Sequence, residues 1–118
     1  MQQKQYNTLI VGVAFSPNIQ ANVFEALRMS KMFTASLVLV HVGEKTNKKE
    51  AVLNKIIYSF DVDIPDCRVL WRAGNPVKVL LGACESENAD LLILGAIKRE
   101  GFLKSVSYTH LTLPTNVA

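Results

Sequence analysis

The sequence predicts an α/β domain in which an open parallel sheet carries helices on both faces. Three observations support this fold class. Apolar runs of strand length recur along the chain, and most of them lack the alternation of a half-exposed strand. Segments with an apolar stripe at helical spacing separate these runs, which gives the order βαβαβαβ. The connections are short, and short connections with right-handed crossovers place consecutive strands in parallel.

Four segments have the composition of strands in such a sheet. Thr8–Phe15, Ser36–Val42 and Ala89–Gly95 are largely apolar, and we expect them to be buried on both faces. Cys67–Arg72 alternates apolar residues with arginines and reads as a shorter, more exposed strand. The sequence therefore places this last segment at an edge of the sheet.

Three helices are predicted between these strands. Ala21–Phe33 carries apolar residues at helical spacing, and a second amphipathic face lies within Leu53–Phe60. A third helix follows Asn75, which can cap free backbone N–H groups, and Pro76, which needs no N–H group at the first helical position. An apolar stripe continues through this helix as far as Cys84.

Length and composition limit the classes of protein to be considered. The chain has 118 residues and 49% apolar content, enough for one small packed domain. The longest apolar run, Leu91–Ile97, is too short for a membrane span, and the N-terminus lacks the apolar region of a secretory signal. We therefore expect a cytoplasmic protein that does not bind membranes.

Charge and cysteine patterns exclude further classes. The formal charge is +3, but the basic residues are scattered and are not interleaved with aromatics, so we expect no nucleic-acid partner. Cys67 and Cys84 stand singly in apolar patterns without the spacing of metal ligands. Both are interpreted as buried small hydrophobic residues, and no metal site is expected.

The character of the sequence changes after Lys104. This architecture requires a fourth helix there, yet Val106–Thr115 has no helical stripe. Every residue of that segment resembles the translation of a transposase-type sequencing adapter. We therefore predict an incomplete domain over residues 1–104 and a non-native tail over residues 105–118. With the last helix and strand missing, the chain is expected to expose apolar surface and to aggregate. The alternative is an unusual natural terminus that forms a short edge strand.

Four ordered motifs resemble the universal stress protein family. They are the segment from Leu9 to Pro17, Leu-Val-His-Val within the second predicted strand, Gly-Asn-Pro before the third helix, and Ala-Asp-Leu-Leu-Ile-Leu-Gly at the fourth strand. Their order and spacing cover almost all of residues 6–104. The resemblance implies strand order 3-2-1-4-5 and a cytoplasmic stress-response regulator that forms a homodimer and acts on unidentified protein partners. One branch of the family binds ATP or AMP, and another does not.

Ligands of open parallel sheets lie where the winding reverses, here between the first and fourth strands. The resemblance implies nucleotide contacts at this cleft. It places Ala14 where the ATP-binding branch has an acidic residue, and Lys98 where that branch has a second glycine after Gly95. Lys98 could instead meet phosphate by its charge. The complete set of candidate residues is Ala14, Phe15, Val40, Gly95, Ala96, Lys98 and Gly101.

Catalysis is not indicated. His41 ends a strand near the expected cleft, but no nucleophile or paired carboxylate accompanies it at recognisable spacing, so a structural role is favoured. Three hypotheses remain open. The chain is a regulator that binds ATP or AMP, or a dimeric interaction protein that binds no nucleotide, which Ala14 and Lys98 favour, or a hydrolase or nucleotidyl transferase. The last rests on fold analogy alone.

Overall fold

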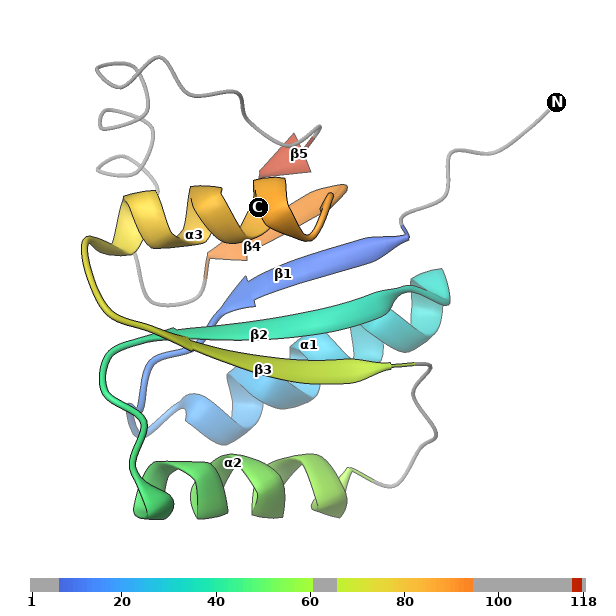
Figure 1. Cartoon of the computed structure of the whole chain (residues 1–118). Helices are drawn as coiled ribbons and strands as arrows, with labels where there is room; N and C mark the ends of the chain where they lie inside the picture. The colour runs from blue at the N-terminus through green and yellow to red at the C-terminus, as the bar shows by residue number, and fades with distance from the viewer. Residues whose placement is uncertain (1–6, 61–65, 95–115, 118) are drawn as a thin grey trace, which may run out of the picture.

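A computed structural model describes residues 7–60, 66–94 and 116–117 (Figure 1). The elements alternate between strand and helix as the sequence predicts. Their bounds are β1 Thr8–Gly12, α1 Ile19–Phe33, β2 Ser36–Val42, α2 Asn47–Ser59, β3 Cys67–Arg72, α3 Pro76–Ser86, β4 Leu91–Leu94 and β5 Asn116–Val117.

All the described strands run parallel in one sheet with the order β3-β2-β1-β4-β5. The predicted α/β class and strand order are therefore confirmed. In the centre of the sheet, β1 pairs with β2 on one side and with β4 on the other, so that Leu9 lies beside both Leu37 and Leu91. β3 pairs with β2 alone among the described elements, which confirms its predicted place at an edge.

The two faces of the sheet carry separate apolar clusters. α1 and α2 cover one face and α3 covers the other (Figure 1). Alternate residues along β1 point to opposite sides: Leu9 and Val11 pack with α1, whereas Ile10 packs with Leu80 of α3. Leu9, Ile10 and Leu80 are at most 1% exposed. This two-sided burial explains why the central strands read as continuous apolar runs.

Several element ends differ from the sequence prediction. β1 stops at Gly12 and not at Phe15, because Ala14 turns its carbonyl to accept a hydrogen bond from Ser16 N–H at 3.0 Å. α1 begins at Ile19 directly after Asn18, which agrees with a predicted start near Pro17 or Asn18. β4 is likewise shorter than predicted and covers Leu91–Leu94. Each change lies where the chain leaves a regular element, while the elements themselves are confirmed.

The expectation that the fifth strand would be missing is wrong. Asn116–Val117 forms a short parallel pair with β4, so residues of the segment interpreted as a non-native tail occupy the fifth strand position. A free edge on β4 offers unpaired backbone groups to any extended segment that reaches it, and this pairing needs no particular side chains. The rest of the predicted tail, and the place of the fourth helix, lie outside the described residues.

Both cysteines are free thiols. Cys84 lies buried in α3 against the sheet, which confirms its interpretation as a small hydrophobic residue, and burial raises the pKa of its thiol to about 12. Cys67 is half-buried on β3, where burial and then the charge of Asp66 raise the pKa of its thiol to about 11. Neither thiol is activated as a nucleophile. None of the described helices is long and apolar enough for a membrane span.

The start of α3 is the predicted cap. Asn75 has an extended backbone, and its Oδ1 accepts hydrogen bonds from Val77 N–H at 3.0 Å and Lys78 N–H at 3.2 Å. Pro76 occupies the first helical position. The cap therefore satisfies two backbone donors that the helix cannot pair internally.

We expect Asn75→Ala to lower the free energy of unfolding by about 1 kcal/mol, because both donors lose their acceptor. Urea denaturation followed by circular dichroism measures the loss. Asn75→Asp is the matched control, since it keeps a side-chain oxygen at the cap, and its stability should stay close to that of the parent. Equal losses in both variants would show that the cap bonds contribute nothing.

Candidate functional site

The winding of the chain reverses at β1. From β1 the chain passes through α1 to β2 and through α2 to β3, and then α3 returns it across the other face to β4, on the far side of β1 (Figure 1). Backbone groups at the carboxyl ends of β1 and β4 diverge at such a point and leave room for a ligand. The structure therefore has the reversal of strand order at which the sequence predicts a cleft.

Two of the candidate residues lie near the carboxyl ends of β1 and β2. Ala14 is partly exposed just beyond β1, and its methyl group offers neither charge nor hydrogen bond. Val40 lies opposite Gly12 on β2 and is 0% exposed, with its side chain among the apolar residues under α3. The Val40 carbonyl accepts a hydrogen bond from Val13 N–H at 2.9 Å. Val40 thus supports the floor of this region through its backbone.

Phe15 points in a different direction from the cleft between β1 and β4. Its ring meets His41 of β2 edge-on at 4.7 Å between centroids and stacks on Trp71 of β3 at 6.1 Å, with 19° between the ring planes. His41 and Trp71 are themselves in edge contact at 5.5 Å. The three rings form an aromatic cluster on the side of β1 opposite to β4. Phe15 therefore anchors the loop after β1.

His41 connects this cluster to the loop after β2. Its side chain is buried, and its Nδ1 lies 2.9 Å from the Val13 carbonyl oxygen. A carbonyl can only accept, so Nδ1 carries the hydrogen and Nε2 is the acceptor. Lys49 Nζ donates to Nε2 at 3.3 Å and to the Glu44 carbonyl at 3.2 Å. It also stands 5.5 Å from the centroid of the Phe15 ring.

These contacts give His41 and Lys49 a structural role. Both ring nitrogens of His41 have partners within the protein, and the Lys49 ammonium is shared between an imidazole, a carbonyl and a ring face. A general base needs a free nitrogen within reach of a substrate proton. The geometry therefore supports the structural role that the sequence favours for His41.

Comparisons with solved structures place the whole architecture. A universal stress protein in complex with cAMP has 20% identity and a TM-score of 0.70, over 98% of this chain and 96% of the other. The universal stress protein UspA from Lactobacillus plantarum has 18% identity and a TM-score of 0.67, over 98% of each chain. A universal stress protein family protein from Arabidopsis thaliana with AMP bound has 17% identity and a TM-score of 0.58, over 95% and 88% of the chains.

The chain has the universal stress protein fold. The resemblance that the four sequence motifs indicate is thereby confirmed at the level of the fold. No family model matches the sequence, and neither does any curated protein. The identities lie far below those at which side-chain functions transfer from one protein to another, so the site must be argued from this chain's own residues.

Only three of the seven candidate residues lie in the part of the chain that the structure describes. Ala14 lies just beyond β1, Val40 is paired with Gly12 within the sheet, and the Phe15 ring packs on His41 and Trp71. The predictions for Gly95, Ala96, Lys98 and Gly101 lie outside the described residues. Over the described ranges 7–60, 66–94 and 116–117, no cluster of three histidine, cysteine or acidic side chains could hold a metal ion.

Sequence reasoning missed Lys49 and Trp71. A signal for Trp71 was present, because Phe15, His41 and Trp71 each stand at or near the carboxyl end of a predicted strand, and those ends meet at one edge of a parallel sheet. Lys49 had no such signal. It reaches His41 from the first turn of α2, where Thr46 Oγ1 accepts a hydrogen bond from the Lys49 N–H at 3.1 Å and fixes the start of the helix.

We expect His41→Phe to lower the free energy of unfolding by about 1 to 3 kcal/mol, because it removes the buried donor to the Val13 carbonyl. The control is Lys49→Met, which removes only the partly exposed partner and should cost less than about 1 kcal/mol. Nitrogen-15 NMR of the imidazole at pH 8 provides a direct check, with the hydrogen on Nδ1. A hydrogen on Nε2 would contradict the assigned bonds.

Proposed function

We propose that this chain is a regulator of the universal stress protein type that binds an adenine nucleotide where β1 and β4 diverge. The observation that carries the proposal is the reversal of winding at β1, which opens a ligand position at the carboxyl ends of these strands. Two proteins of the same fold support the choice of ligand, since one is in complex with cAMP and another has AMP bound.

The described residues suit a base or sugar better than a charged group. Ala14 presents a methyl group, and Val40 is fully buried, so neither side chain supplies a carboxylate for the ribose hydroxyls. Recognition of phosphate then falls to the segment after β4, where Lys98 supplies an ammonium. A point charge of this kind favours the ligand with the larger phosphate charge.

The same proposal covers how the protein acts. It works by binding and not by turnover, as a cytoplasmic homodimer that passes its state to protein partners. The engagement of both ring nitrogens of His41 supports this view, because the one histidine in the described part of the chain has no nitrogen free for proton transfer.

A second candidate function follows from Ala14 alone. The sequence resemblance associates the nucleotide-binding branch with an acidic residue at this position, and an alanine there removes a charged hydrogen-bond acceptor. The alternative is an interaction protein of the same fold that binds no nucleotide. The two candidate functions differ in nucleotide affinity, which a titration measures.

Calorimetric titration of ATP, AMP and cAMP into the folded chain tests the proposal. We expect saturable micromolar binding with ATP the tightest of the three, because phosphate is recognised by charge. Lys98→Met should weaken ATP by about tenfold and AMP by less. Ala14→Asp should tighten all three ligands by restoring an acceptor for the ribose.

The matched control for charge is Lys31→Met, which lies in the last turn of α1, outside the cleft, and should leave every affinity unchanged. Circular dichroism confirms that each variant is folded before titration. Heat equal to that of dilution for all three nucleotides, in the parent and in Ala14→Asp alike, would overturn nucleotide binding and favour the interaction protein.

A further inference from the structure

The outer edge of β3 carries backbone groups that no other described element pairs. Asp66 C=O accepts from Leu37 N–H at 2.7 Å, and Arg72 C=O accepts from Gly43 N–H at 2.8 Å. Even-numbered residues of β3 therefore turn their backbone groups toward β2. The period of two along a strand turns those of Cys67, Val69 and Trp71 outward. Such an edge can accept an additional strand.

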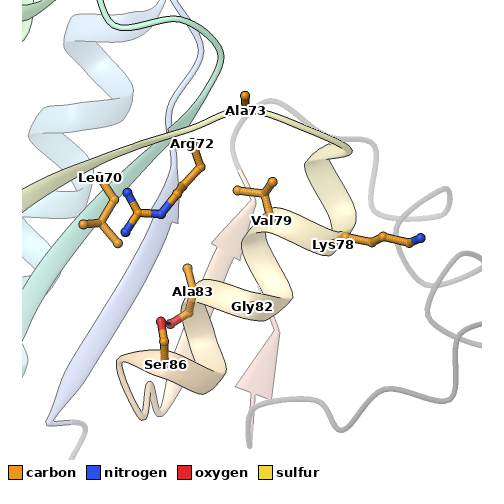
Figure 2. Close-up of a pocket in the computed structure, with 8 residues that line it drawn as sticks. All are labelled: Leu70, Arg72, Ala73, Lys78, Val79, Gly82, Ala83 and Ser86. Atoms are coloured by element: carbon orange, nitrogen blue, oxygen red, sulfur yellow. Dashed lines mark hydrogen bonds between the residues drawn. The ribbon is translucent and has the colours of Figure 1, made fainter.

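A basic groove lies beside this edge on the face that α3 covers (Figure 2). Its volume is about 250 Å³, and its floor is formed by Leu70 of β3 and by small residues of α3. Arg72 and Lys78 are its charged lining residues, and no carboxylate of the described residues lines it. Figure 2 shows the Arg72 side chain lying back along β3 toward Leu70. This face of the edge is therefore positively charged.

A second groove lies on the opposite face, between β3 and α2. Its volume is about 560 Å³. Cys67, Val69 and Trp71, whose backbone groups face outward, line it together with Leu53 and Ile57 of α2. The charged side chains of its rim have partners, because Lys45 Nζ stands 3.5 Å from Glu50 Oε2 and Asp66 Oδ2 stands 4.0 Å from Arg68 Nε. Trp71 contributes its indole to this groove and is half-buried. This face of the edge therefore presents apolar side chains of β3 and α2 within a partly polar rim.

We propose that the β3 edge is a docking site for an extended segment of a partner protein in which acidic and apolar residues alternate. Side chains of an added strand point alternately to the two faces. One set would lie in the basic groove beside Arg72, and the other set would pack in the second groove against the apolar side chains of Val69 and Trp71. The backbone of the segment would pair with the outward groups of β3.

The charge pattern favours an acidic partner over a second copy of this chain. Arg68 is already paired, with Glu87 at 2.9 Å and Asp66 at 4.0 Å. Arg72 Nη1 donates a hydrogen bond to the Trp71 carbonyl at 3.1 Å, and no described carboxylate forms a salt bridge with Arg72. Pairing β3 with the β3 of another copy would bring arginines together on one face, which is repulsive. A strand with carboxylates on that face removes the repulsion.

This site is separate from the proposed nucleotide cleft. β2 lies between β3 and β1 in the sheet, so the docking edge is on the far side of β2 from the cleft. Failure of either proposal leaves the other unaffected. A variant at Arg72 should therefore change docking and leave nucleotide titrations as they are.

The full chain provides its own reporter for the test, because Trp71 is the single tryptophan. The probe is a capped synthetic peptide, Glu-Val-Glu-Val-Glu-Val-Glu, which has the same alternation in both strand directions. We expect a saturable change in Trp71 fluorescence. The Lys-Val-Lys-Val-Lys-Val-Lys peptide should bind at least about tenfold more weakly, because its ammonium groups would face Arg72.

Reversing the charge at Arg72 tests whether the acidic side chains of the peptide lie in the basic groove. Arg72→Glu should weaken the acidic peptide by about tenfold or more and should make the lysine peptide the better ligand. Arg28→Glu is the matched control, since Arg28 is an exposed arginine of α1 that lines neither groove, and it should change neither affinity. Unchanged affinity for the acidic peptide in Arg72→Glu would overturn the assignment.

A modified peptide tests backbone pairing without any change in the protein. N-methylation of the valines alone, or of the glutamates alone, removes the donors from one edge of the peptide at a time. One of the two modifications should abolish binding and the other should preserve it. Hydrogen exchange should slow at the amides of Val69 and Trp71 when the peptide is bound. Equal effects of both modifications, or Arg72-dependent self-association of the chain, would contradict docking of an acidic strand.

Discussion

Burial of β1 on both faces and pairing on both of its edges is the constraint on which the molecule depends. Leu9 and Ile10 point to opposite sides of the sheet, and neither has any exposed surface. A strand surrounded in this way must have parallel neighbours connected by helices that cross the faces. Asp90 Oδ2 secures the start of the strand by accepting from Asn7 N–H at 2.7 Å and Thr8 N–H at 3.1 Å. All parallel strands then deliver their carboxyl ends to one edge, where the aromatic cluster and the cleft lie side by side.

The elements and their order could be predicted from the sequence because they depend on local patterns. Continuous apolar runs identify strands buried on two sides, and the Asn75 cap identifies the start of α3. The ends of the elements were harder to predict from the sequence. The end of β1 depends on the turn at Ala14, and the short β5 depends on backbone pairing with β4, which leaves no pattern in the side chains of Asn116–Val117. Propensity and periodicity do not describe such pairing.

The candidate site was predictable as a place but not as an arrangement of side chains. Topology fixes the position where β1 and β4 diverge, and the sequence pattern already indicates it. The direction of Phe15 does not follow from that pattern, because the alternation of a strand ends at Gly12 and the ring is then positioned by His41 and Trp71. The Lys49 contact requires α2 to pack beside β2, so it belongs to tertiary structure alone.

The aromatic cluster also determines how the two proposed surfaces relate to each other. Phe15 belongs to the loop that borders the cleft, and Trp71 belongs to the strand at the docking edge, yet their rings stack directly. Contact alone does not transmit a change, since coupling requires an element with two stable arrangements. Here His41 holds the loop through the Val13 carbonyl and is itself held by Lys49. A cluster fixed at this many points resists small displacements from either side. Ligands at the cleft and at the β3 edge should therefore bind independently.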